Sequence, residues 1–113
     1  MSQHDDDLRM LHMLEHAKEA VGMVQGRTRQ DLDADRQLNL ALVRLLEIVG
    51  EAAARVTSAT RKAHPQIPWQ QIAGLRNRLI HGYDEVDFDV LWAILRDDLP
   101  QLVEQLRVLL KAN

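Results

Sequence analysis

The sequence contains no cysteine, only three prolines and few aromatic side chains. Without cysteine the chain forms no disulfide and offers no thiolate to a metal. No apolar run approaches the roughly 20 residues that a membrane-spanning helix needs, and the polar, acidic start from Met1 to Asp7 is unlike a secretory leader. We therefore expect a soluble cytoplasmic protein without membrane contact. Its 113 residues suit one domain, residues 1–113, with a modest core.

Charge is distributed unevenly along the chain. The net charge is −3, but residues 52–83 contain no carboxylate and carry five cations. The remaining residues hold nine cations and seventeen carboxylates, a balance of −8. Such segregation can give a positive surface that binds a polyanion locally and releases it readily. Equally, these cations can pair with acidic residues of neighbouring helices, and the sequence alone leaves both readings open.

Helical periodicity runs through most of the chain. Apolar residues recur at spacings of three and four, with Asp31 or Asp33 as a possible helix cap, Gly82 as a stop and Pro100 as an interruption. These signals predict amphipathic helices over about 5–24, from 31 or 33 to 63, 69–82, from 87 or 89 onward, and 102–110.

Strand signals are nearly absent, since no two-residue hairpin turn separates alternating runs. We therefore predict an all-α fold, an up-and-down bundle of four to five helices. Small residues at 50–54 would allow two helices to approach closely. A bundle this small can leave an apolar stripe uncovered, so we also expect a homodimer.

Residues 76–83, Arg-Asn-Arg-Leu-Ile-His-Gly-Tyr, concentrate the chemistry of the chain. An arginine holds phosphate through a planar fork of donors, a histidine moves protons near neutral pH, and a tyrosine offers a hydroxyl for modification. The combination suggests phosphodiester chemistry. The simpler interpretation is a helix end, where a histidine interacts with the last carbonyls.

Spacing alone does not bring Arg76 and His81 together. Five steps along an ideal helix separate them by about 140°, whereas Asn77 and Arg78 would share the face of His81. Arg76 can join His81 if the last turn unwinds before Gly82, if its long side chain bends round, or if a second subunit supplies half of the site.

The segment from Trp69 to Asp87 resembles the HepT-like toxin branch of the HEPN superfamily. The signature of that branch, Arg, four residues, His, any residue, Tyr, falls on Arg76, His81 and Tyr83. The likeness continues through residues 47–53 upstream and 92–100 downstream. It implies a helical homodimer in which two motifs meet in a composite cleft, and the toxin component of a type VII-like toxin–antitoxin pair.

The resemblance also implies metal-independent cleavage of RNA that leaves a 2′,3′-cyclic phosphate. His81 would act as general base or general acid, two roles the sequence does not separate. Arg76 would stabilise charge on the phosphate, and Asn77 would orient the substrate or His81. Arg78 would pair with an acidic residue or add a phosphate contact. At Tyr83, a nucleotidyltransferase antitoxin would attach AMP and block the site with negative charge.

No cofactor and no metal site are predicted. His12 and His16 stand at i and i+4 but lack a well-placed third ligand. Glu47 and Glu51 have the same spacing and could form an acid–base pair, but a structural or substrate-orienting role is equally open, and neither is assigned to catalysis. The alternative function is a non-catalytic subunit that binds a nucleotide or a partner within a nucleotidyltransferase complex. A missing Arg76 or His81 would have favoured it, and both are present.

Overall fold

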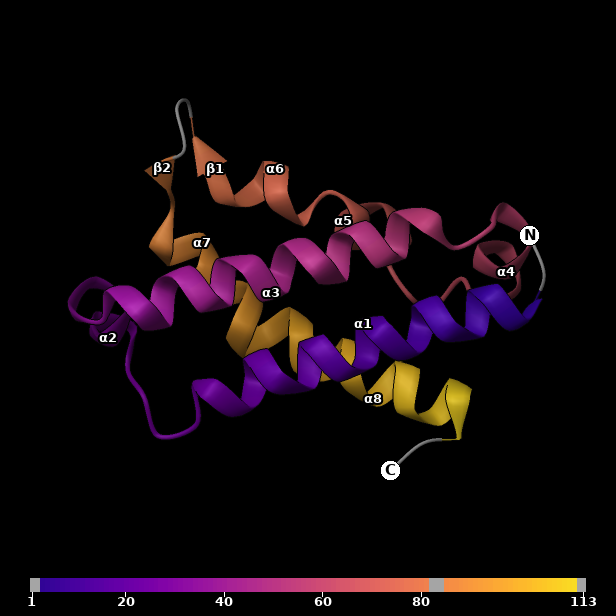
Figure 1. The fold of residues 1–113 in the computed structure, drawn as a ribbon, viewed down its shortest axis with the longest axis horizontal. Coiled ribbons are helices and arrows are strands. Elements are labelled where there is room, and N and C mark those ends of the chain that lie inside the picture. The colour runs from indigo at the N-terminus through magenta and orange to yellow at the C-terminus, as the bar shows by residue number, and fades with distance from the viewer. Residues whose placement is uncertain (1–2, 82–84, 112–113) are drawn as a thin grey trace.

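The protein is all-α, and its helices run up and down along the length of the molecule in rods, each rod being one helix or several consecutive helices in line (Figure 1). The computed structural model describes residues 3–81 and 85–111. Helix α1 spans Gln3–Met23, α2 Arg29–Ala34, α3 Arg36–Arg55, α4 Ser58–Ala63, α5 Trp69–Ala73 and α6 Leu75–Leu79. Two short strands follow, β1 (Ile80–His81) and β2 (Glu85–Val86), and then α7 (Phe88–Ala93), the π-helical turn η1 (Ile94–Asp98) and α8 (Leu99–Leu110). The predicted all-α bundle is confirmed.

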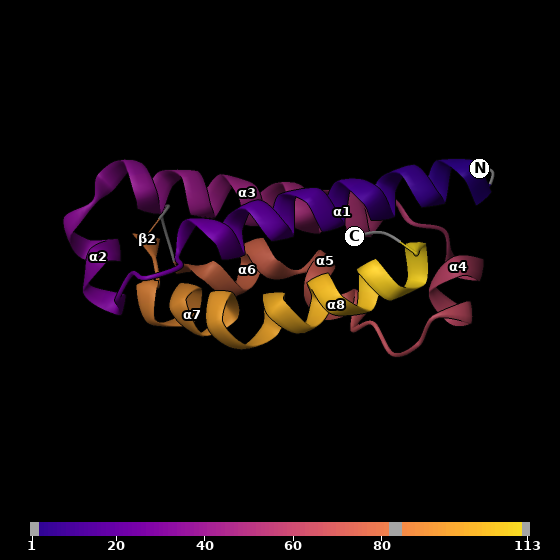
Figure 2. The ribbon, with the colours of Figure 1, turned by 90° about the horizontal axis from the view of Figure 1, so that it is seen from below.

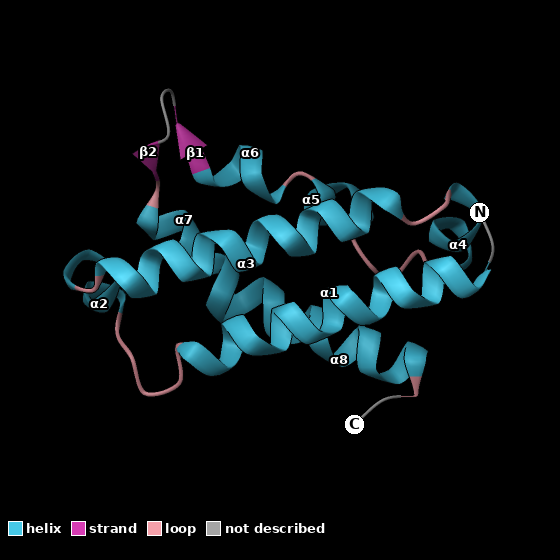
Figure 3. Cartoon of the chain, viewed as in Figure 1, coloured by secondary structure: helices cyan, strands magenta, loops and turns pink. Residues whose placement is uncertain are grey.

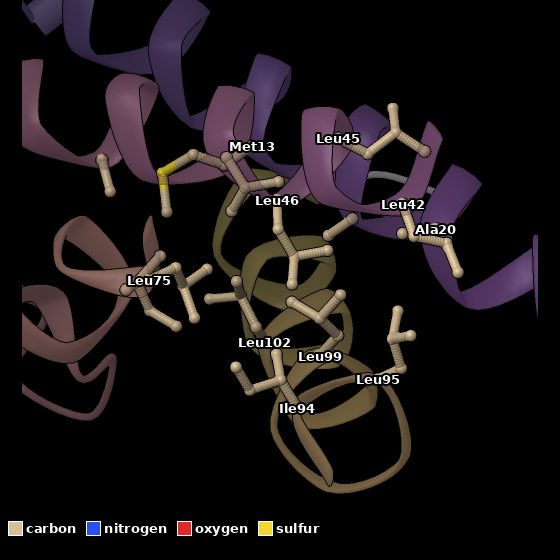
Figure 4. Packing of buried hydrophobic residues seen from close by; sticks show 14 of the residues in the cluster. Met13, Ala20, Leu42, Leu45, Leu46, Leu75, Ile94, Leu95, Leu99 and Leu102 are labelled. Carbon is tan, nitrogen blue, oxygen red and sulfur yellow. The ribbon is translucent and has the colours of Figure 1, made fainter. Parts of the chain in front are cut away.

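The rods lie in two layers (Figure 2). Helices α1 and α3 form one layer, and α5 to α8 form the other. Leucine, methionine and isoleucine side chains from both layers meet between them, as Met13, Leu46, Leu75, Ile94 and Leu99 illustrate (Figure 4). Among the described residues, no helix is long and apolar enough to cross a membrane.

Local capping divides the predicted second helix into three pieces. Asp35 has extended backbone angles, ends α2 and caps α3 by accepting from the Leu38 N–H at 3.0 Å. Thr28, with Asp31 in a capping box, begins α2, so the predicted start at Asp31 or Asp33 was wrong. At the other end Thr57 caps α4, and the Arg61 guanidinium donates to the carbonyls of residues 53, 54 and 56. Arg61, one of the five cations in residues 52–83, therefore caps the C-terminal end of α3.

Pro100 does not break the last rod. Proline cannot donate the i to i−4 hydrogen bond, and its ring crowds the preceding turn. The chain accommodates it by widening the turn just before, where the Leu99 N–H bonds to the Ile94 carbonyl across η1. Pro100 then lies in the first turn of α8, where its missing N–H costs nothing. The predicted interruption is thus a change of hydrogen-bond pattern within a run of helix that continues from α7 through η1 into α8, cyan in Figure 3.

Helix α6 ends at Leu79, earlier than the predicted stop at Gly82, which lies outside the described residues. Residues 80–81 and 85–86 pair instead as a short antiparallel ladder, drawn in magenta in Figure 3, with Ile80 opposite Val86 and His81 opposite Glu85. The Asp87 N–H also donates to the Leu79 carbonyl at 2.8 Å. A ladder of two residue pairs is too short to leave a periodic signal that would identify a strand from the sequence.

Close approach of α3 to α5 depends on Gly50. A Cβ at this position would lie 3.0 Å from the Ile72 carbonyl oxygen and 3.4 Å from that of Ala73. The predicted role of the small residues at 50–54 is confirmed at this position. Gly50→Ala should gain up to about 1 kcal/mol of helix propensity but lose about 1–3 kcal/mol through overpacking. We expect a net destabilisation of about 1 kcal/mol in urea unfolding.

The matched control is Gly22→Ala in α1, where an added Cβ meets nothing within 4 Å. This variant should be as stable as the wild type or more so, because only the propensity term changes. Equal stabilisation by both substitutions would show that α3 and α5 can move apart to accept the extra methyl group without loss of stability.

Asp6 ties the start of α1 to α4 and is only 2% exposed. Its carboxylate accepts from the Thr57 N–H at 3.0 Å, the Thr57 hydroxyl at 2.5 Å and the Thr60 hydroxyl at 2.6 Å. Burial raises the pKa of Asp6, but the hydrogen bonds from Thr57 and Thr60 outweigh it, so the pKa is lowered overall. Stability from this group is therefore present above the ordinary carboxyl pKa of about 3.9 and is lost as pH falls through the lowered value.

Asp6→Asn should destabilise the fold at pH 7 by about 1–3 kcal/mol, because an amide cannot accept all three hydrogen bonds. The difference from wild type should shrink as pH falls below about 4, measured by chemical unfolding at each pH. Asp7→Asn, at an exposed neighbour, should show neither effect. A constant difference between Asp6→Asn and wild type across pH would contradict the assignment.

Candidate functional site

Arg76 projects from α6 to a carboxylate of α3. Its Nε lies 3.1 Å from Oε2 of Glu47, and the side chains are 60% and 23% exposed. A single-point contact of this kind at the surface contributes little to stability, so phosphate can compete for the guanidinium. Arg76 and Glu47 line two surface hollows. Asn77 and Gly50 also line the first, and Ile80 and Phe88 also line the second.

His81 lies on β1 and not in the last turn of a helix, as the helix-end interpretation required. Since side chains alternate along a strand, His81 faces away from Ile80, which packs against the core. Its Nε2 lies 3.1 Å from Oδ2 of Asp87. The imidazole is 64% exposed and therefore accessible to a substrate.

Asp87 is held firmly at the start of α7. Its Oδ1 accepts from the backbone N–H groups of Asp89 at 3.0 Å and Val90 at 3.1 Å, so of the two predicted starting points for this helix, Asp87 and Asp89, Asp87 is the cap. The bond from Val90 is the chief cause of a lowered Asp87 pKa, and the His81 side chain lowers it further. Asp87 is thus ionised at neutral pH.

Arg78 pairs with Asp98 of η1, with Nη2 3.2 Å from Oδ2. The predicted pairing of Arg78 with an acidic residue of a neighbouring helix is confirmed. Residues 76 and 78 are two steps apart on α6, so they point to nearly opposite sides, toward α3 and η1 respectively. Arg76 and Arg78 are therefore each paired with a carboxylate, on nearly opposite sides of α6, and the positive charge of residues 52–83 is partly neutralised.

Within one chain, Arg76 and His81 contact different carboxylates, and no hydrogen bond joins the two among the described residues. Because α6 ends at Leu79, the expected helical sharing of a face by Asn77, Arg78 and His81 was wrong. The helix does unwind before Gly82, which was one of three ways in which Arg76 could reach His81. Unwinding alone does not bring the two side chains into contact. Tyr83, the predicted modification position, lies outside the described residues.

Two contacts made by the motif were not identified from the sequence. Glu47 is 29 positions from Arg76, and only the packing of α3 beside α6 brings them together. Asp87 carried a helix-cap signal, but its contact with His81 depends on the short ladder between β1 and β2. Nothing in the sequence pattern signalled that ladder.

The chain folds as a helical bundle with Arg76 on α6 and His81 on β1, and Tyr83 follows in the sequence, so it has the fold class and the signature expected of a HEPN-type protein. The chain belongs to the ribonuclease HepT-like family, whose match covers residues 12–109. The recognised family resemblance is therefore confirmed.

Relatives similar to this chain carry ribonuclease names. A probable ribonuclease HepT of Thermococcus cleftensis is 38% identical over 93 residues, covering 79% of this chain and 84% of the relative. A candidate RNase of Caldanaerobacter subterraneus subsp. tengcongensis is 34% identical, covering 88% and 89% of the two chains. Another from Methanocaldococcus jannaschii is 30% identical, covering 96% and 99%. No solved structure gives a significant match.

Proposed function

We propose that this protein is an endoribonuclease toxin that cleaves RNA with Arg76 and His81. The observation that carries the proposal is the site itself: an exposed guanidinium and an exposed imidazole, each in contact with a carboxylate, in a chain of the HepT-like family. Relatives across most of this chain are named as ribonucleases, which supports RNA as the substrate.

The reaction proposed is transesterification without a metal ion. The ribose 2′-hydroxyl attacks the adjacent phosphorus, and the bond from phosphorus to the 5′-oxygen of the next nucleotide breaks. The products are a 2′,3′-cyclic phosphate and a 5′-hydroxyl, with one proton removed from the attacking oxygen and one delivered to the leaving oxygen. His81 handles proton transfer, and Arg76 stabilises the charge on the phosphate oxygens. Asn77, which lines the same hollow as Arg76, orients the substrate, and Arg78 gives an accessory phosphate contact.

Each active centre combines Arg76 of one chain with His81 of a second chain in a homodimer. Support comes from the single chain, in which these residues contact separate carboxylates and not each other. A composite cleft would bring the two motifs within reach of one phosphate. In this arrangement, RNA competes with Glu47 for Arg76.

Neutralisation is proposed to occur by AMP transfer to Tyr83 from a nucleotidyltransferase antitoxin encoded as the partner of this toxin. The tyrosine hydroxyl would attack the α-phosphorus of ATP and release pyrophosphate. The added phosphate would place negative charge two residues from His81 and compete with RNA for Arg76. Intact mass before and after incubation with the antitoxin and ATP tests this step, with Tyr83→Phe as the control.

The ribonuclease proposal is tested by incubating purified protein, shown by intact mass to carry no AMP, with end-labelled total RNA in EDTA. Cleavage should occur, and enzymatic end-group analysis should find cyclic phosphates. The Arg76→Ala/His81→Ala double variant should leave the RNA intact. Equal fragmentation by both proteins would reveal a contaminating nuclease. No cleavage by either would favour the non-catalytic subunit.

A further inference from the structure

The most constrained carboxylate near the candidate site is Asp87. Its Oδ1 is fixed by two backbone N–H groups of α7, and its own N–H donates to the Leu79 carbonyl at 2.8 Å. Only Oδ2 remains for a side chain, and it contacts Nε2 of His81 at 3.1 Å. The carboxylate is therefore anchored to both α6 and α7 at the point where it contacts the imidazole.

We propose that Asp87 positions His81 and fixes its tautomer, so that Nδ1 is the nitrogen that exchanges a proton with RNA. This inference rests on the proposed ribonuclease function. Asp87 is a positioning residue, because it contacts the imidazole and not the substrate. From the sequence, Asp87 was expected only as one of two possible starting points of a helix.

The tautomer follows from hydrogen-bond chemistry. An ionised carboxylate only accepts hydrogen bonds, so the Nε2 that faces Asp87 must carry the hydrogen. In a neutral imidazole the other nitrogen, Nδ1, then has a free lone pair. Nδ1 forms no hydrogen bond with the described residues, and the ring is 64% exposed. His81 is thus prepared to accept the 2′-hydroxyl proton through Nδ1.

Proton transfer would convert His81 to an imidazolium that still donates from Nε2 to Asp87. The negative carboxylate then stabilises the positive charge formed during the reaction. In each centre, the neutral His81 therefore takes the base role. The imidazolium formed at Nδ1 then donates that proton to the leaving 5′-oxygen.

Asp87→Asn separates positioning from folding. An asparagine keeps an oxygen for the two α7 N–H groups and is a good helix cap. It presents an NH₂ donor where Asp87 presents Oδ2, which favours an unprotonated Nε2 and moves the hydrogen to Nδ1. The base nitrogen would then be occupied.

Glu85→Gln is the matched control. Glu85 lies directly opposite His81 in the ladder and carries the same charge, but it forms no hydrogen bond with the imidazole among the described contacts. Both variants lose one negative charge beside His81. Only Asp87→Asn changes the group that touches Nε2.

The first readout is ¹⁵N NMR of the imidazole at a pH where His81 is neutral, with its signals assigned by their loss in His81→Ala. Wild type and Glu85→Gln should show the hydrogen on Nε2, and Asp87→Asn should show it on Nδ1. The second readout is RNA cleavage. Asp87→Asn should lower kcat by about 10²-fold or more, within the range for lost general base catalysis, with a small change in KM, while Glu85→Gln stays near wild type.

An unchanged tautomer in Asp87→Asn would overturn the proposal, as would an equal loss of kcat in Glu85→Gln. Thermal unfolding of the variants separates these results from misfolding. If the wild type itself does not cleave RNA, the tautomer shift still decides the positioning role, and the failure belongs to the ribonuclease proposal alone.

Discussion

His81→Ala should lower the rate of RNA cleavage by about 10²–10⁴-fold, the contribution expected of a positioned general acid or base. The imidazole is exposed and contacts Asp87, and no other histidine lies in the signature. Removing the imidazole eliminates the group that transfers the proton. It leaves no cavity in the core, because His81 is exposed on β1, a surface strand of two residues. The melting temperature should therefore stay close to that of the wild type.

The matched control for this experiment is His12→Ala, at an exposed position in α1. It removes an imidazole from the surface without touching the signature and should cleave RNA like the wild type. Cleavage by His81→Ala at the wild-type rate would contradict the catalytic assignment. Loss of cleavage together with early unfolding would instead indicate a structural defect.

Arg76→Ala should lower kcat by about 10²–10³-fold, the loss typical when one donor to a developing oxyanion is removed. The guanidinium is 60% exposed, and among the described residues its side-chain partner is Glu47, so the fold should be little changed. Arg76→Lys should recover part of the activity, because an ammonium keeps the charge but not the planar fork of donors. Single-turnover cleavage at saturating RNA measures the effect on chemistry separately from binding.

Arg44→Ala is the control for Arg76→Ala. Arg44 is 61% exposed and pairs with Glu51 of the same helix at 3.5 Å, so its removal takes away a similar charge and a similar ion pair. It should leave kcat near wild type. A loss in Arg44→Ala equal to that in Arg76→Ala would show that Arg76 acts only through overall charge.

The course of the rods was predictable because apolar spacing of three and four residues persists through each of them. The positions at which one helix ends and the next begins were not predictable in this way. Asp35 and Thr57 cap helices only because their side chains reach specific backbone groups. Pro100 predicted an interruption, and the structure has a π-helical turn there. Whether a helix stops at a proline or widens into such a turn depends on how the whole rod packs.

In the candidate site, too, one part could be predicted from the sequence and another could not. Arg76 and His81 were identified from side-chain chemistry and from a family signature, neither of which requires knowledge of the fold. Glu47 and Asp87 become their partners through contacts between separate elements. Spacing on a continuous helix gave a wrong set of neighbours for His81, because the helix ends two residues earlier.

The central claim is a ribonuclease centre that takes Arg76 from one chain and His81 from another. The most direct test is to unfold Arg76→Ala and His81→Ala proteins together, refold them as a mixture, and confirm mixed dimers by native mass spectrometry. Each mixed dimer contains one centre with both residues intact, so the mixture should regain RNA cleavage that neither variant shows alone. Mixed dimers that remain inactive, or chains that stay monomeric under conditions where the wild type cleaves, would contradict the composite site.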